Sequence, residues 1–449
     1  MMTLGEAARV LRGEASAAAA RFDGVSTDRR SIKAGELFVA LRGERFDGHD
    51  FLAAAAARGA GAALIDRRYS GGFPLPVLVV DDTRHALGDL ARAWRQRFSP
   101  ALIAITGSNG KTTVKEMLAA ILRKNAGDGP VLATAGNLNN DIGVPLTLLG
   151  LRGRHRWCAI ELGMNHRGEI AYLADIARPS VALVNNAQRE HLEFMHSVEE
   201  VAAENGSVYE ALPADGVAVV NADDPHAAYF RDRAQPRTII DYGLRDGAVT
   251  GRYELKHLSS EIRIGTPKGE TQATLAIPGL HNVRNALAAA ACALAAGLPA
   301  ETIGPGLSAF RPYSGRLQVK QGRGGLTVID DTYNANPDSV RAAIDVLASC
   351  PAPTALVLGD MGEVGEQGPA FHREVGDYAR AKGVSRLLTL GEATRHAVSA
   401  FGGEARHFET VDELVAALEA KTVLVKGSRF MKMERVVAAL VGAASQGGH

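Results

Sequence analysis

The sequence predicts an α/β protein built from three domains. Apolar runs alternate with segments of helical periodicity, a glycine-rich turn at residues 107–110 follows one of these runs, and 449 residues are too many for a single hydrophobic core. Such alternation favours mostly parallel sheets covered by helices on both faces. We expect a small α/β domain over residues 1–83, a central domain with a mostly parallel sheet of the phosphate-loop type over 84–312, and a Rossmann-like α/β domain over 313–449.

Composition excludes several classes of function. Fifty basic and fifty acidic residues leave no net charge, so neither a nucleic acid nor an anionic membrane is indicated as a partner. Cys158, Cys292 and Cys350 lack disulfide or metal-ligand spacing, which fits a reducing cytosol. The N-terminus carries Glu6 and no long apolar region, and the longest uncharged run, 285–300, is too weakly apolar to span a bilayer. We therefore expect a cytoplasmic protein without membrane insertion.

The first domain mixes short strands with an alanine-rich helix. The helix is expected at 51–58 and the strands at 37–41, 62–65 and 77–80. Two polar loops, 24–30 and 42–50, hold several hydrogen-bond donors and an aromatic residue. Such loops suit a uracil and a diphosphate, although plain surface turns have the same composition. The candidate residues here are Ser26, Thr27, Asp28, Phe46 and His49.

A helix at 84–98 is expected to link this domain to the central one, where the glycine turn lies between the apolar run 101–105 and a helix. Such a turn presents backbone N–H groups and the positive end of a helix dipole to an anion. Lys111 adds a charge for the β- and γ-phosphates of a nucleotide, and Thr112 a hydroxyl for Mg²⁺. The standard spacing GxxxxGK[ST] would need glycine at Ile105, so an ordinary turn with a surface lysine is the alternative. The candidate turn residues are Gly107, Ser108, Asn109, Gly110, Lys111, Thr112 and Thr113.

Two polar residues follow later strands of the central sheet. Further strands are expected at 157–160, 181–184 and 217–220. Glu161 ends the first of these, and His191 lies a few residues past the second. Because ligands bind beyond the carboxyl ends of parallel strands, we expect both side chains near the glycine turn. A lone histidine in a loop is usually structural, and its meeting a carboxylate and a phosphate loop favours a functional role.

Two further stretches of the central domain are expected to be helical. Ser197-Val198-Glu199-Glu200 has the form of a capping box, and the helix that it starts ends before Pro213. Asn282 and Asn285 are three residues apart and so share one helix face. Paired amides can meet a donor and an acceptor of adenine, although capping explains one asparagine equally well.

The third domain again alternates strands with helices. Its strands are expected at 326–329, 355–358, 386–390 and 422–425. Three of them end in polar or glycine-bearing loops, at 330–337, 359–362 and 426–429. We find no glycine fingerprint for a dinucleotide, so the domain is not predicted to hold such a cofactor.

Together these residues resemble a known family, the ATP-dependent Mur ligases of peptidoglycan synthesis. The resemblance covers nearly the whole chain, and the order and spacing of the motifs are far more specific than any one of them. The motifs are Ser26-Thr27-Asp28, TGSNGKTT (106–113), GNLNNDIGVP (136–145), ELGMNHRGEI (161–170), GLHNVRNALAA (279–289), Gly315-Arg316-Leu317, DDTYNANPDS (330–339), LGDMGEVG (358–365) and VKGSR (425–429).

The resemblance implies an enzyme that uses ATP and Mg²⁺ to join D-alanyl-D-alanine to UDP-N-acetylmuramoyl-tripeptide. It implies that Lys111 contacts the β- and γ-phosphates, that Thr112 and Glu161 hold a first Mg²⁺, and that Glu161 and His191 hold a second. Arg316 would reach the γ-phosphate from the third domain. Lys111, Glu161, His191 and Arg316 are thus the expected catalytic residues.

The resemblance also assigns the substrate contacts. Asn282 and Asn285 would meet the adenine of ATP, and Asp331 its ribose. The first domain would bind the UDP portion of the substrate. Its sugar-peptide portion would meet Asn137, Asn139, Asn140 and Asp141. The dipeptide would meet Asn334, Asn336, Lys426, Ser428 and Arg429. All partners would be small molecules, and we expect a monomer.

One position departs from the family pattern. Many members carry a lysine, modified to a carbamate that bridges to the second metal, fourteen residues after the histidine. Here that position is Asn205, whose short amide side chain cannot form a carbamate. We therefore expect no need for carbon dioxide, and we expect Glu204 or water to complete the shell of the second metal.

Three rival functions make different predictions. A sister ligase that adds a diamino acid would carry an Asp-Asn-Pro-Arg motif, where this chain has Leu358-Gly359-Asp360-Met361-Gly362. A folate-polyglutamylating ligase would lack the first domain's loops around Ser26 and His49. A nucleotide-binding switch or transport ATPase would hydrolyse ATP without a peptide acceptor and would leave the third domain unexplained.

Overall fold

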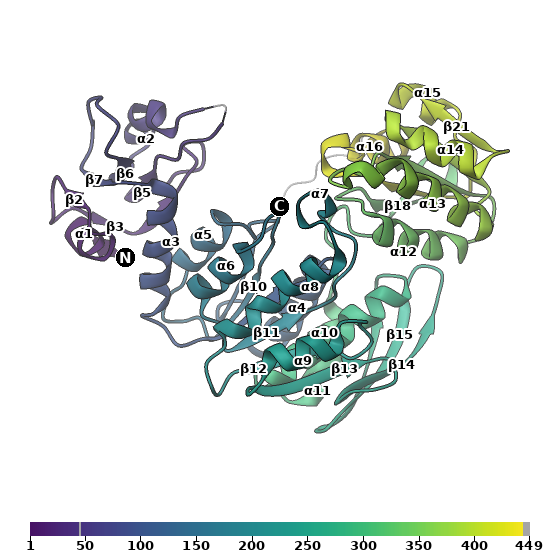
Figure 1. Ribbon diagram of the computed structural model, residues 1–449, viewed down its shortest axis with the longest axis horizontal. Coiled ribbons are helices and arrows are strands. Elements are labelled where there is room, and N and C mark those ends of the chain that lie inside the picture. The colour runs from purple at the N-terminus through teal and green to yellow at the C-terminus, as the bar shows by residue number, and fades with distance from the viewer. Residues whose placement is uncertain (45, 443–449) are drawn as a thin grey trace.

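The computed structural model describes residues 1–44 and 46–442, and it folds as three α/β domains, each built around its own main sheet (Figure 1). The central domain lies between the first and the third, which stand on opposite sides of it in Figure 1. The predicted fold class is confirmed. Within the described residues, every helix is too short or too polar to span a bilayer.

The first domain holds a five-stranded sheet, parallel except for one edge strand. In spatial order its strands are β2 (Glu14–Ala15), β7 (Val77–Val80), β6 (Ala62–Asp66), β5 (Glu36–Val39) and β4 (Gly24–Ser26), with β2 antiparallel. A small second sheet pairs β1 (Met2–Thr3) with β3 (Arg21–Phe22). The helices are α1 (Leu4–Leu11) and α2 (Leu52–Ala57), the latter preceded by a 3₁₀ turn, η1 (Gly48–Phe51). The sequence thus predicted β6 and β7 closely, while β5 ends at Val39 and not at residue 41.

Helix α3 (Thr83–Arg95) joins the first two domains, and it ends three residues earlier than predicted. Its N-cap Asp82 accepts hydrogen bonds from the backbone N–H groups of Arg84 and His85. Trp94 donates to the Leu151 carbonyl at 3.1 Å, which fixes α3 to the central domain. A single apolar cluster runs from the first domain through α3 into the central one, so these two domains share a core.

The central domain is built on a nine-stranded sheet. Its first seven strands are parallel: β9 (Val131–Ala133), β10 (Trp157–Glu161), β8 (Ala101–Thr106), β11 (Val181–Val184), β12 (Val217–Asn221), β13 (Thr238–Gly243) and β14 (Val249–Leu255). The antiparallel strands β15 (Ser260–Thr266) and β16 (Gly269–Leu275) extend it. The strands predicted here lie in the parallel part, where burial on both faces explains their unbroken apolar runs.

Helices cover both faces of this sheet. On one face, Ile103 and Ile105 of β8 join the apolar cluster of α4 (Lys111–Ala126), α10 (Leu280–Ala295) and α11 (Ala300–Ala309). On the other, Leu102 and Ala104 join the cluster of α5 (Gly143–Leu149), α6 (Glu169–Ala177), α8 (Val198–Gly206) and α9 (Ala227–Ala234). Ser197 caps α8 as predicted, although Glu200 pairs with Arg167. The helix predicted to end before Pro213 is divided into α8 and a 3₁₀ turn, η2 (Ser207–Ala211).

The third domain has a six-stranded sheet. Its order is β17 (Gln318–Gln321), β18 (Thr327–Asp331), β22 (Thr422–Lys426), β19 (Thr354–Gly359), β20 (Arg386–Leu390) and β21 (Ala405–Phe408), with only β17 antiparallel. Its helices are α12 (Pro337–Ala348), α13 (Gly368–Ala381), α14 (Arg395–Phe401), α15 (Val411–Ala416) and α16 (Glu434–Val441).

Polar contacts hold the third domain against the central one. The Arg189 guanidinium lies 2.6 Å from the Asp338 carboxylate and 2.7 Å from that of Glu374, and these contacts raise its pKa. Asn336 at the start of α12 donates to the Asn109 side chain at 3.0 Å. Since Asn109 belongs to the glycine turn, the third domain meets the central one at the predicted nucleotide site.

Candidate active site

The glycine turn has the backbone that an anion-binding loop requires. Gly107 and Gly110 have φ angles of +125° and +83°. A Cβ at Gly107 would lie 2.9 Å from the backbone nitrogen of Asn186, and one at Gly110 would lie 2.4 Å from the Asn285 side-chain oxygen. Because α4 begins at Lys111, its positive end faces the turn. The shortened loop therefore has the strand-turn-helix geometry expected for phosphate binding.

The Lys111 side chain folds back over the turn. Its ammonium donates to the carbonyls of Gly107 at 2.5 Å and Ser108 at 3.1 Å, and it lies 3.0 Å from the Glu190 carboxylate. Burial acts to raise the pKa of Glu190, but the Lys111 charge and His191 outweigh it and keep that pKa low. The sequence reasoning missed Glu190, and its place directly before His191 is the only local signal.

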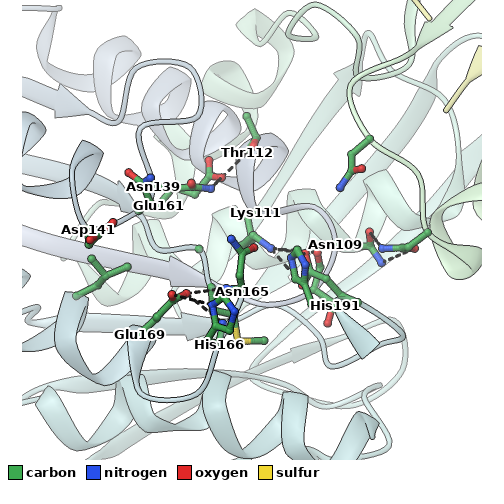
Figure 2. A pocket seen from close by; sticks show the side chains of 18 of the residues that line it. Asn109, Lys111, Thr112, Asn139, Asp141, Glu161, Asn165, His166, Glu169 and His191 are labelled. Carbon is green, nitrogen blue, oxygen red and sulfur yellow. Dashed lines mark hydrogen bonds and ion pairs between the residues drawn. The ribbon is translucent and has the colours of Figure 1, made fainter. Parts of the chain in front are cut away.

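His191 also belongs to this charged network. Its Nε2 lies 3.5 Å from Glu190, and its Nδ1 lies 2.7 Å from Glu363 of the third domain. Burial acts to lower the pKa of His191, but the bonds to both carboxylates raise it to about 9. Figure 2 shows His191, Lys111, Thr112 and Glu161 in one pocket, as predicted from the sheet edge.

Glu161 is the residue best suited to a metal ion. Register pairs it with Ile105, so the end of β10 lies beside the turn. Its Oε1 accepts from the Thr112 hydroxyl at 3.2 Å and from Asn139 at 2.8 Å, while its buried Oε2 has no hydrogen-bond partner among the described residues. A buried carboxylate oxygen without a hydrogen-bond partner suits Mg²⁺, an ion that usually keeps phosphate and water among its ligands. Nowhere in residues 1–44 and 46–442 do three His, Cys, Asp or Glu side chains form a metal cluster.

The structure contradicts the expected role of Glu204 at a second metal. The Glu204 carboxylate accepts from the backbone N–H groups of Gly168 and Ile170, both at 2.8 Å, and so holds the first turn of α6. The neighbouring Asn205 is buried and accepts from the Thr106 hydroxyl at 2.6 Å. Asn205 therefore fixes the end of β8, immediately before the glycine turn.

The paired asparagines line a second cavity, of about 550 Å³, on the other side of the turn. Asn285 donates to Asn282 at 3.0 Å and accepts from Asn185 at 3.0 Å. Neither caps α10, whose N-cap is Gly279. Arg316 and Asp331 of the third domain line the same cavity, which places the predicted adenine and ribose residues together.

Arg316 reaches the turn from the third domain. Its guanidinium lies 3.5 Å from the Thr112 hydroxyl and stacks over the Tyr333 ring, 4.0 Å from the ring centre. Asp331 accepts from the Leu317 backbone N–H at 3.2 Å and from the Lys426 ammonium at 2.6 Å. Lys426, expected to contact the dipeptide, lines both cavities while its ammonium is bonded to Asp331, and burial lowers its pKa.

The other dipeptide candidates divide into two groups. Asn334 and Asn336 line the cavity that holds Lys111 and Glu161, of about 530 Å³. Ser428 instead bonds to the backbones of Ala335 and Gly362. Arg429 has an exposed side chain that pairs with Glu434. Neither Ser428 nor Arg429 lines a cavity that holds Lys111, so the structure does not bring them into the site.

The UDP-substrate candidates divide in the same way. The cavity that holds Lys111 and Glu161 is lined by Asn139, Asn140 and Asp141, together with Arg84, His166 and Arg167, which the sequence did not single out. Asn139 contacts Glu161, Asn140 bonds to the first turn of α5, and Asp141 pairs with Arg84. Asn137 is not among the residues that line this cavity.

In the first domain, Ser26, Thr27 and Asp28 form a half-buried loop, and hydrogen bonds to Arg30 lower the pKa of Asp28 to about 2. Phe46 is 60% exposed and free to contact a ligand. His49 corrects the prediction, because it is only 2% exposed. Its Nδ1 lies 2.5 Å from Asp47 and its Nε2 accepts from the Asp66 backbone N–H at 3.1 Å. Both ring nitrogens are thus used inside the domain.

Three family models match the chain, and their descriptions agree. They are the Mur ligase family catalytic domain at residues 21–95, the Mur ligase middle domain at 105–293, and the Mur ligase glutamate ligase domain at 315–429. The UDP-N-acetylmuramoyl-tripeptide–D-alanyl-D-alanine ligase of Escherichia coli K12 is 42% identical, with 98% of both chains covered.

Two solved structures extend the comparison. The crystal structure of MurF from Acinetobacter baumannii superposes with a TM-score of 0.91 at 35% identity, covering 98% of both chains. MurF ligase from Thermotoga maritima in complex with ADP superposes with a TM-score of 0.81 at 26% identity, covering 93% of this chain and 96% of the other.

Proposed function

This chain belongs to the Mur ligase family, and we propose that it joins D-alanyl-D-alanine to the carboxyl end of UDP-N-acetylmuramoyl-tripeptide at the expense of ATP. The observation that carries the proposal is the set of groups around the Thr112 hydroxyl. Glu161 of the central domain and Arg316 of the third lie 3.2 and 3.5 Å from it. The Lys111 ammonium lies in the same cavity.

The chemistry explains why such groups are needed. A carboxylate does not condense with an amine in neutral water, because its oxygen is a poor leaving group. Attack of the carboxylate on the γ-phosphorus of ATP forms an O–P bond and breaks the bond between the γ-phosphorus and the oxygen that leaves with ADP. The dipeptide amine then attacks the acyl carbon of this acyl phosphate, a C–N bond forms, inorganic phosphate leaves, and the amine loses a proton.

The cations of the site act on the first of these steps. Two unit charges of like sign about 4 Å apart repel by roughly 4 kcal/mol at an effective dielectric of 20, and ATP carries several. We propose that Lys111 and Arg316 offset this repulsion from opposite sides of the transferred phosphoryl group. We also propose that Thr112 and Glu161 hold Mg²⁺, which would supply further charge neutralisation and orientation at the phosphates. His191 would join them only on losing the proton that Glu190 and Glu363 stabilise, because a protonated imidazole has no lone pair for a metal.

The two cavities indicate how the substrates are arranged. We propose that adenine and ribose occupy the cavity lined by Asn282, Asn285 and Asp331. The carboxyl end of the UDP-linked peptide would then lie in the cavity lined by Asn139 and Glu161. The third domain closes the phosphate region and would keep the acyl phosphate from water. Because the enzyme consumes ATP, we propose that it works in the cytoplasm. We also propose that it is a monomer.

Phosphate release tests the proposal against its nearest rival. Purified protein is given ATP and Mg²⁺ with UDP-N-acetylmuramoyl-tripeptide and D-Ala-D-Ala, or with the UDP-linked dipeptide and lysine or diaminopimelate. We expect phosphate and the pentapeptide product only in the first mixture. Product with a diamino acid would favour the sister ligase, and ATP hydrolysis without an acceptor would favour an ATPase module.

Two variants connect this activity to the site. Lys111→Ala should abolish turnover with the circular dichroism spectrum unchanged, because the β- and γ-phosphates lose their lysine. Lys124→Ala, on an exposed position of the same helix α4, is the matched control and should keep full activity. Near-normal turnover of Lys111→Ala would refute the phosphate-loop assignment.

A further inference from the structure

The third domain presents Arg316 on a preformed support. Gly315 has a φ of +74°, and its carbonyl accepts from the Tyr333 backbone N–H at 3.1 Å. On the other side of Arg316, the Leu317 N–H donates to Asp331. The backbone on both sides of Arg316 is thus hydrogen-bonded to Asp331, the last residue of β18, and to Tyr333, which follows that strand.

The Tyr333 ring supports the guanidinium itself. The central carbon of the guanidinium lies 4.0 Å from the ring centre, within the range of a cation–π contact. This contact uses the flat face of Arg316 and leaves its N–H edge free. The buried Arg316 Nε has no hydrogen-bond partner among the described residues. The Arg316 Nη2 lies 3.5 Å from the Thr112 hydroxyl. The stacked arginine therefore points unused donors at the phosphate side of the turn.

Tyr333 also lies at the acceptor side of the site. With Asn139, Asn140 and Asp141, it lines the cavity assigned to the UDP-linked peptide. Arg316 lines this cavity and also the cavity assigned to adenine and ribose. Tyr333 thus supports the arginine that faces both cavities.

We propose that Tyr333 is a positioning residue for phosphoryl transfer: its ring aligns the Arg316 guanidinium beside the acceptor cavity. This inference rests on the proposed function. An arginine that is held in place before the reaction loses less conformational freedom when it binds the transferred group. Removing the ring should slow the chemical step, while removing only the hydroxyl should leave it nearly unchanged.

Steady-state kinetics of four variants test the proposal. Tyr333→Leu should lower kcat roughly tenfold with little change in the KM for D-Ala-D-Ala, a size typical of a partly buried cation–π contact. Tyr333→Phe keeps the ring and should therefore keep kcat, and the KM for the UDP-linked tripeptide, within about twofold. Arg316→Met should lower kcat further. In the Arg316→Met background, adding Tyr333→Leu should change kcat by less than about twofold, because the ring then has no guanidinium to align.

Controls separate alignment from general packing. Phe408→Leu removes a ring that lies under Arg406 at the edge strand β21, 5.4 Å from that guanidinium, and should leave kcat and KM unchanged. Tyr333→Met fills the space without an aromatic face and replaces Tyr333→Leu if the latter does not fold. Equal loss of kcat with and without Arg316, or a loss of kcat in Tyr333→Phe as large as in Tyr333→Leu, would overturn the alignment role. If the wild-type enzyme forms no amide bond, it is the proposed function that fails.

Discussion

Replacing Glu190 with glutamine should make the enzyme bind ATP more tightly. The Glu190 carboxylate lies 3.0 Å from the Lys111 ammonium and 3.5 Å from His191 Nε2. All three side chains are about nine-tenths buried, so solvent screens them weakly. Glu190 therefore competes with the β- and γ-phosphates for the same cation.

The size of the effect follows from the charge that is removed. A unit charge pair about 4 Å apart is worth roughly 4 kcal/mol at an effective dielectric of 20, which is an upper limit because glutamine still accepts a hydrogen bond from Lys111. If about a third of this energy opposes nucleotide binding, the Kd should fall about tenfold, equivalent to about 1.4 kcal/mol.

Calorimetric titration with a non-hydrolysable ATP analogue and Mg²⁺ measures this Kd directly. Glu193→Gln is the matched control, because it removes one negative charge from an exposed position in the same segment and should leave the Kd unchanged. An equal or weaker affinity in Glu190→Gln would refute the reasoning, since the carboxylate would then assist nucleotide binding.

Three further predictions concern other parts of the chain. Lys426→Met should raise the KM for ATP about tenfold, because Lys426 holds Asp331, and should change the KM for D-Ala-D-Ala by less than about twofold. Steady-state kinetics measure both constants, and a rise in the KM for D-Ala-D-Ala alone would instead support a dipeptide contact. Added bicarbonate should not stimulate turnover, because Asn205 forms no carbamate and is buried against Thr106; strong stimulation would contradict this. Burial acts to raise the pKa of Asp66, but the hydrogen bond from Arg42 outweighs it and lowers this pKa from 3.8 to about 2. The ionised carboxylate therefore stabilises the fold above pH 3.8, and this stabilisation is lost as the pH falls through about 2. Asp66→Asn should therefore lower the melting temperature at neutral pH by more than at pH 2, and a constant difference would refute this.

The sequence could predict those features that depend on local pattern. The predicted strands of the central sheet are apolar runs because helices cover both faces. The glycine turn follows β8 and leads into α4, an order that presents a helix end to an anion. Glu161 could be placed because strands β8 and β10 end at the same edge of the sheet. The shared face of Asn282 and Asn285 follows from helical periodicity alone.

The contacts that the sequence could not predict join distant segments. Lys426 meets Asp331 across 95 residues, so VKGSR could not by itself distinguish a substrate contact from a structural pair. His49 is buried by its bond to the backbone of Asp66 on a separate strand. Glu204 was expected at a metal because it adjoins Asn205, yet the nearest unfilled donors are the backbone N–H groups that begin α6. In each case a partner elsewhere in the fold decided which way the side chain points.

Oxygen isotope transfer tests the central claim most directly. The tripeptide substrate is prepared with ¹⁸O in its terminal carboxyl group, the enzyme is given ATP and D-Ala-D-Ala, and the released phosphate is analysed by mass spectrometry. If the carboxylate attacks the γ-phosphorus, one labelled oxygen leaves with the phosphate each time an amide bond forms. Phosphate free of label, with amide product formed at the normal rate, would contradict activation of the carboxyl group by ATP at the glycine turn.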